Sequence, residues 1–453
     1  MRYACDTGCI KGGSSQLLTF FVQVELDGGS GLEVALKWIR RALYLTQLTP
    51  ELLGIAVKRE LSQIPAAVRN GSGVMSALSW LTNYTDADND LNGHALRQQP
   101  FLVDLEAQLS TSEGGAAAVA SLAALRTVLL QPQRMNVFVA GDLTKLSAPH
   151  AALAAALRPP SAAAAAAPAP ASAAAPAAAG PISGVEQYRL LSGREAQVVV
   201  ASLSAIETHY VTASAPGLAP YSADHAALLV AIELLTALEG DFWVKLRGLT
   251  LALTPNPNPN PNPNPNPNPD QVKLRGAGLT YSYSIRVSLD SRRISFNLFK
   301  CGDMLGAYTA AKDIITGYAS GRSQMSEVDL DGAKSTVAYG IIAGTSTRLG
   351  AAAVAWESCY EGKGVDYGKW LLAELRTVGA ADALHALKKY IVPQLTLTLT
   401  LTLTLTLTLS RYIVPLFDAS ANVVVTCPSN KLDAAADGLE AALGVPVRTL
   451  QQD

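Results

Sequence analysis

The chain has little charge, few cysteines and an almost balanced count of acids and bases. Charged residues make up 16% of its 453 residues, and 35 Lys and Arg against 37 Asp and Glu give a net charge of −2. Without a basic stripe the composition excludes a nucleic-acid partner. The cysteines are odd in number and widely spread, at positions 5, 9, 301, 359 and 427. This spread predicts no disulfide framework and indicates a reducing compartment.

Targeting and membrane signals are also missing. The first residues, Met1 to Asp6, lack the charged and then apolar pattern of a signal peptide, and no apolar run of about 18 residues is free of Thr, Pro or charge. We therefore expect a soluble protein with no membrane partner, in the cytoplasm or an organellar matrix and not secreted.

Histidine spacing excludes a catalytic zinc site within this chain. None of the five histidines stands in His-x-x-Glu-His or His-Glu-x-x-His, so neither a metal site nor a catalytic residue is predicted. Glu207 and His209 form the one alternative, a metal or acid-base pair on one strand face, but they lack a third ligand. His225 shares the apolar face of a helix, which is typical of a core histidine.

Length and composition predict two domains. With 49% apolar residues, the chain divides into a first domain at 1–158, an Ala/Pro-rich linker at 159–184 and a second domain at 185–453. Asn136–Leu146 aligns without a gap to Asn422–Leu432, with five of eleven positions identical. We expect an α+β fold of two tandem related domains, each a mainly antiparallel sheet with helices packed on one side.

Periodicity predicts the elements of the second domain. Strict alternation of apolar and polar residues over 279–289 predicts a strand, and 294–298 continues the pattern as an antiparallel hairpin. Further strands are expected at 197–203 and 208–213, with a helix capped by Ser222 between them and the hairpin.

Two low-complexity tracts, at 249–271 and 394–411, interrupt this domain. The first holds a Pro-Asn repeat and the second a Leu-Thr repeat, and each is flanked by a duplicated pentapeptide or tetrapeptide. We interpret both as simple-sequence DNA retained or misassembled in the gene. The alternative is a Pro-rich loop and a long Leu/Thr strand, which would be an aggregation hazard at a sheet edge.

One motif carries the functional prediction. Arg275 lies six residues before Tyr281, which opens the 279–289 strand, and Gly276 and Gly278 lie between them. This segment resembles the Arg/Tyr substrate motif in the C-terminal half of pitrilysin/insulinase-type zinc metallopeptidases, the inverzincins. It is most similar to the presequence-protease branch, although Ser282 stands where that branch often has Gly. Tandem α+β domains are what the resemblance implies.

By this resemblance the chain is the non-catalytic C-terminal half of a zinc metalloendopeptidase. It would enclose and orient peptide or unfolded polypeptide substrates, with Arg275 and Tyr281 as substrate-binding residues. Zinc would belong to an N-terminal half supplied in cis or in trans, so the chain alone is predicted to be inactive. The alternative function is a non-catalytic interaction or regulatory subunit derived from the same family. The structural alternative for the motif makes Tyr281 an aromatic on a buried strand face and Arg275 a solvated loop residue.

Overall fold

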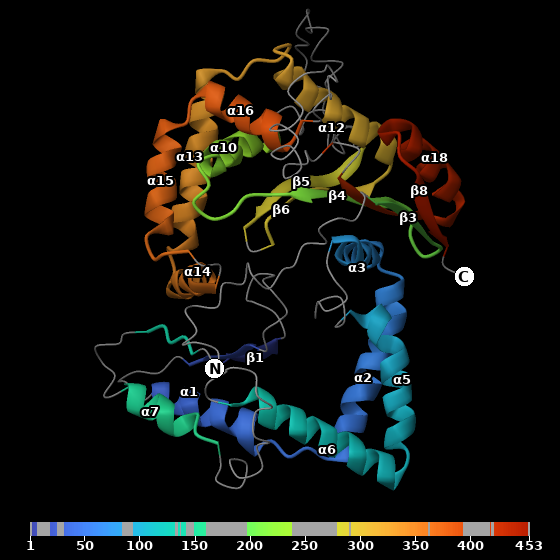
Figure 1. Ribbon diagram of the computed structural model, residues 1–453, viewed down its shortest axis with the longest axis vertical. Helices are drawn as coiled ribbons and strands as arrows, with labels where there is room; N and C mark the ends of the chain where they lie inside the picture. Colours follow the sequence, from blue (N-terminus) through green and yellow to red (C-terminus); the bar gives the residue numbers. More distant parts are fainter. Residues whose placement is uncertain are drawn as a thin grey trace, which may run out of the picture. The chain divides into compact units, whose positions relative to one another are not determined.

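A computed structural model gives the arrangement of the chain (Figure 1). It describes residues 2–6, 19–24, 31–83, 94–131, 135, 137–141, 149–159, 197–237, 279–289, 291–360, 363–392, 417 and 421–451. The chain forms two compact units. Unit 1 comprises residues 1–67, 87–182 and 348–360, and unit 2 comprises residues 68–86, 183–347 and 361–453.

Unit 1 is helical in its described part. Its elements are β1 (Arg2–Asp6), β2 (Thr19–Gln23), α1 (Gly31–Arg40), the π-helix η1 (Arg41–Leu45), α2 (Pro50–Val68), α5 (Ala95–Leu109), α6 (Ser112–Leu129), α7 (Pro149–Ala156) and α14 (Arg348–Tyr360). Thr111 caps α6, since its hydroxyl accepts from the Gly114 N–H at 3.1 Å. Arg40 donates to the carbonyls of Ala156 and Arg158 at 3.0 and 2.8 Å, and so joins the ends of α1 and α7.

Unit 2 is built on one six-stranded mixed sheet in the order β5-β6-β4-β7-β3-β8. The strands are β3 (Val198–Leu203), β4 (His209–Pro216), β5 (Thr280–Ser288), β6 (Arg293–Cys301), β7 (Asn422–Pro428) and β8 (Val447–Gln451). The pairs β5·β6, β6·β4 and β4·β7 are antiparallel, whereas β3 pairs in parallel with both β7 and β8. Among the described strands, β5 and β8 are therefore the two edges.

Helices cover one face of this sheet and enclose the main core (Figure 1). They are α10 (His225–Thr236), α12 (Met304–Ala319), α13 (Glu327–Gly344), α15 (Tyr367–Thr377), α16 (Ala380–Tyr390) and α18 (Leu432–Leu443). The core holds fully buried side chains such as Phe296 and Leu298 on β6 and Leu228 and Leu235 on α10. No helix of the described ranges is long and apolar enough to cross a membrane.

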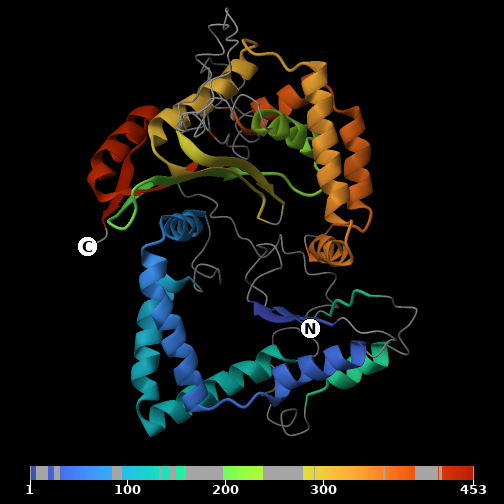
Figure 2. The ribbon, with the colours of Figure 1, turned by 180° about the vertical axis from the view of Figure 1, so that it is seen from behind.

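A single helix from the first part of the sequence packs on the opposite face. It is α3 (Gly71–Asn83), which lies under the sheet in both views (Figure 2). Gly71 is required at its start, because a Cβ there would stand 2.6 Å from the Tyr210 ring. The Thr426 hydroxyl donates to the Gly71 carbonyl at 2.9 Å. The expected division at 159–184 would have put this helix in the first domain, whereas it packs on the sheet of the second.

Two side-chain amides, the buried Asn83 and the half-buried Asn422, fasten the other end of α3. Asn422 donates to the Asn83 side-chain oxygen at 2.7 Å, and Asn83 donates to the Ser214 hydroxyl at 3.0 Å. The Asn422 oxygen also accepts the Gln197 N–H at 3.0 Å. Each amide is thus paired on both its donor and its acceptor side, as burial demands.

The structure confirms part of the expected architecture and corrects the rest. The α+β class, the strand at 279–289 and the hairpin after it are confirmed, with β5 and β6 paired in register from Thr280 opposite Cys301 to Ser288 opposite Arg293. The helix after β4 begins at His225 with Asp224 at its N-cap, so Ser222 does not cap it. Of the two expected sheet domains, the described residues show one large sheet, the six-stranded sheet of unit 2. Residues 137–141 form no strand, and the described part of unit 1 holds only the two-stranded β1·β2 sheet.

The linker at 159–184 lies outside the described residues beyond position 159, and so do both low-complexity tracts. Residues 391 and 392 before the second tract and residue 417 after it are described, however. The Phe417 N–H donates to the carbonyl of Ile391, with 3.4 Å between nitrogen and oxygen, and both side chains are buried. The two flanks therefore meet at one point of the core.

This meeting point predicts the effect of a deletion. Removing residues 394–415 would leave Phe417 four residues after Ile391, which is the separation of an ordinary α-turn hydrogen bond. We expect the shortened chain to keep its fold and to gain about 1–2 kcal/mol of stability, because a shorter loop costs less closure entropy. Thermal melting followed by circular dichroism measures this. A melting temperature lowered by more than ~5 °C would show instead that the deleted residues contribute to the core.

Candidate functional site

The start of β5 is held in place by a concentrated set of hydrogen bonds. The Leu279 carbonyl accepts from the Gly302 N–H at 2.9 Å and from the Cys301 thiol at 2.9 Å. The Thr280 hydroxyl donates to the carbonyls of Ser282 and Phe299 at 3.0 and 3.2 Å. The strand therefore enters the sheet at a fixed position, and the direction of the next side chain, Tyr281, is fixed with it.

Tyr281 is 64% exposed although it opens a well-ordered strand. The structure thus places its ring at the surface and not in the core. The ladder pairs Thr280 with Cys301 and Ser282 with Phe299, and it omits the pair between them, Tyr281 and Lys300.

Lys300 explains the gap in the ladder. Its φ of 52° lies in the left-handed region, which costs a non-glycine residue roughly 1–2 kcal/mol. Its side chain is exposed, with the ammonium 5.8 Å from the centroid of the Phe299 ring. A strained, exposed cation across from an exposed phenol is the kind of outlier that marks functional sites. The sequence contains no signal for the left-handed φ of Lys300, because a lysine in an alternating strand predicts regular pairing.

The hairpin that carries these residues is basic. From position 280 to 301 the sequence has four bases, Arg286, Arg292, Arg293 and Lys300, and one acid, Asp290. Arg293 reaches the Ser214 hydroxyl at 3.2 Å, whereas Arg286 is exposed. At one end of this hairpin Tyr281 and Lys300 are a phenolic and a cationic donor, which suit ligands that offer carbonyl or carboxylate oxygens. Arg275, the other expected substrate-binding residue, lies outside the described residues, so its pairing with Tyr281 stays a prediction.

The alternative pair of Glu207 and His209 is wrong as a strand-face site. Glu207 is exposed and precedes β4, which begins at His209. The His209 ring is buried, its Nδ1 lies 3.1 Å from the Cys301 carbonyl oxygen, and burial lowers its pKa. Burial also raises the pKa of the Cys301 thiol to about 12, so this cysteine is a neutral donor and not a nucleophile.

His225 is a core histidine, as the sequence predicted. It is 4% exposed, and its Nδ1 lies 2.6 Å from the Tyr367 hydroxyl. Burial lowers its pKa to about 4, so the ring is neutral at pH 7. Within the described ranges no three His, Cys, Asp or Glu side chains stand close enough together to hold a metal ion. The residues present there do not fit a zinc site.

No family profile matches the chain. An uncharacterized protein of Saccharomyces cerevisiae is 22% identical over 387 residues, which cover 84% of this chain and 34% of that protein. The chain thus spans about a third of the length of this relative.

Two solved structures are similar to the chain. The inactive M16 peptidase domain of Pseudomonas fluorescens matches with a TM-score of 0.48 and 12% identity, over 89% of this chain and 77% of that one. The periplasmic protease PqqL of Escherichia coli matches with a TM-score of 0.46 and 12% identity, over 88% of this chain and 35% of that one. The chain is an α+β protein that is similar to an inactive M16 (pitrilysin-family) peptidase domain.

Proposed function

We propose that this chain is the non-catalytic, substrate-binding half of a zinc metalloendopeptidase related to the presequence proteases. The observation that carries the proposal is the exposed Tyr281 at the hydrogen-bonded start of β5, across from the strained Lys300. The sequence motif adds Arg275 to this pair.

The chemistry follows from the donors. A phenol and an ammonium or guanidinium can each donate to the carbonyl oxygens of an extended peptide, and a phenol can also stabilise the oxyanion that forms when such a carbonyl is attacked. Water activation would come from zinc and a carboxylate in the other half of the peptidase. The role of this chain would be to enclose the peptide and to hold its backbone in position.

A binding measurement on the full chain tests the proposal. We expect a fluorescein-labelled, unstructured peptide to bind with an anisotropy change, and Tyr281→Phe to weaken binding about fivefold, since one hydrogen bond is worth roughly 1 kcal/mol. Lys300→Ala should weaken binding to a similar extent. Tyr221→Phe is the matched control, because Tyr221 is 46% exposed and lies outside both the hairpin and α13.

Three outcomes would contradict the proposal. Equal binding by Tyr281→Phe and Tyr221→Phe would show that the Tyr281 phenol does not contact the peptide. Absence of peptide binding would favour a regulatory subunit that contacts other proteins without gripping substrate. Stoichiometric zinc with chelator-sensitive hydrolysis by the purified chain would show that it is catalytic by itself.

A further inference from the structure

The outer face of α13 exposes large apolar side chains. Val328 is 82% exposed, Tyr339 73% and Ile342 58%, and the smaller Gly332 and Ser335 between them are exposed as well. The opposite face of the helix is used within unit 2, where Leu330 and Ala333 are buried and α13 packs on α10 and α15. We call the five exposed residues, Val328, Gly332, Ser335, Tyr339 and Ile342, the α13 seam.

The seam has the spacing of a coiled coil. Its members follow one another by four, three, four and three residues, which keeps them on a single stripe of the helix. An amphipathic helix normally turns such a stripe toward a core, and α13 already has its core stripe on the other side. A second stripe of this kind indicates packing against a further helix.

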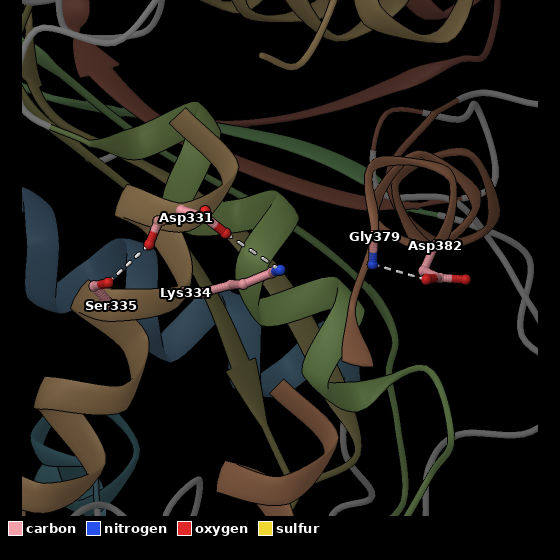
Figure 3. A network of polar contacts seen from close by, with 5 residues as sticks. All are labelled: Asp331, Lys334, Ser335, Gly379 and Asp382. Atoms are coloured by element: carbon pink, nitrogen blue, oxygen red, sulfur yellow. Dashed lines mark hydrogen bonds and ion pairs between the residues drawn. The ribbon is translucent and has the colours of Figure 1, made fainter. Parts of the chain in front are cut away.

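Small residues in the middle of the seam would allow that helix to come close. A Cβ on Gly332 would meet nothing within 4 Å, so no contact in this chain requires glycine there. Glycine is the least favourable helix residue after proline, which makes it an unexpected choice for a solvated position. The Ser335 hydroxyl is turned back to the Asp331 carbonyl at 2.8 Å, which keeps this part of the seam flat (Figure 3).

Charge at the seam indicates the chemistry of the partner. Glu327, Asp329 and Asp331 are exposed in the first turns of α13, and the nearest base, Lys334, is paired with Asp331 at 3.5 Å (Figure 3). Residues 335–347 carry no charge. If a second copy of the chain packed its own α13 on the seam, a parallel pair of helices would place the two acidic ends together. An antiparallel pair would place each acidic end against an uncharged end. A partner with basic residues at one end matches the seam better.

We propose that the α13 seam is a docking site for an amphipathic helix of another polypeptide. The partner helix carries apolar residues at four-three spacing and Lys or Arg beside the acidic end of α13. This proposal is independent of peptide binding at Tyr281, because the two surfaces share no residue.

Two synthetic helical peptides test the seam. Both carry Leu at four-three spacing, and one has Lys where the other has Glu at the flanking positions of one end. We expect the full chain to bind the Lys peptide roughly tenfold more tightly than the Glu peptide, and Tyr339→Arg to weaken that binding by at least about tenfold. The control is Ala434→Arg, which adds the same charge to an exposed position of α18 and should change nothing.

Each remaining outcome would overturn the proposal. No binding of either peptide below about 100 µM would mean that the seam takes no helix. Equal binding of the two peptides would show that the seam does not select a basic partner. An equal loss of affinity in Tyr339→Arg and Ala434→Arg would show that the binding is nonspecific. Sedimentation velocity tests whether a second copy of the chain occupies the seam. A dimer that Tyr339→Arg dissociates would assign the seam to a second copy.

Discussion

Replacing Phe296 with alanine is expected to destabilise unit 2 by about 3–5 kcal/mol, the largest effect of any single change considered for this chain. Phe296 is fully buried on β6, and its ring centroid lies 4.9 Å from that of Phe417 and 6.4 Å from that of Tyr308. Removing the ring takes away its burial and leaves a cavity that the two neighbouring rings cannot fill without moving. Typical domains are stable by roughly 5–15 kcal/mol, so much of the stability of this unit would be lost.

Phe299, on the same strand, provides the matched control. It is 37% exposed and meets the Tyr210 ring edge-on at 5.1 Å on the opposite face of the sheet. Phe299→Ala should therefore cost about 1–2 kcal/mol, since less area is buried and less cavity is left. Urea denaturation followed by tryptophan fluorescence measures both, because Trp80 and Trp370 belong to unit 2. Equal costs for the two variants would mean that the main core is not centred on Phe296.

The strand β5 shows what the sequence could predict. Nine residues that alternate between apolar and polar fit a half-buried strand and no other element. The side-chain period of two therefore predicts both that β5 exists and which of its residues share a face. The burial of His225 could be predicted as well, because a polar residue on the apolar stripe of a helix is normally buried with one hydrogen-bond partner.

The position of α3 and the solvent exposure of Tyr281 could not be predicted in this way. Packing of α3 on the far face of the sheet depends on contacts more than 300 positions apart in the chain, such as that from Thr426 to Gly71. The exposure of Tyr281, at 64%, goes with its position at the end of an edge strand, although the alternation of the sequence is intact there. The φ of Lys300 is a tertiary constraint with no sequence signature.

Acid should destabilise the chain through His225, and this gives the second large effect. Its pKa of about 4 in the folded state lies below the ordinary value of about 6.5, because burial disfavours the charged ring and the nearby Lys363 adds to the effect. Below pH 6.5 the unfolded chain therefore binds a proton that the folded chain does not. The contribution of His225 is complete above this pH and falls until the pH reaches the folded pKa, with a total loss of about 3 kcal/mol.

The contribution of His225 can be separated from that of other groups by substitution. His225→Gln cannot titrate, so the stability difference between the wild type and this variant should shrink by roughly 2 kcal/mol between pH 7 and pH 4.5. His209, which is also buried with a lowered pKa, acts in the same direction in both proteins and cancels from the difference. The control is His385→Gln, an exposed position on α16. A difference that stays constant with pH, or one that His385→Gln reproduces, would contradict the role of burial. In that case the charged His225 ring would donate a charge-assisted hydrogen bond to the Tyr367 hydroxyl across the 2.6 Å contact.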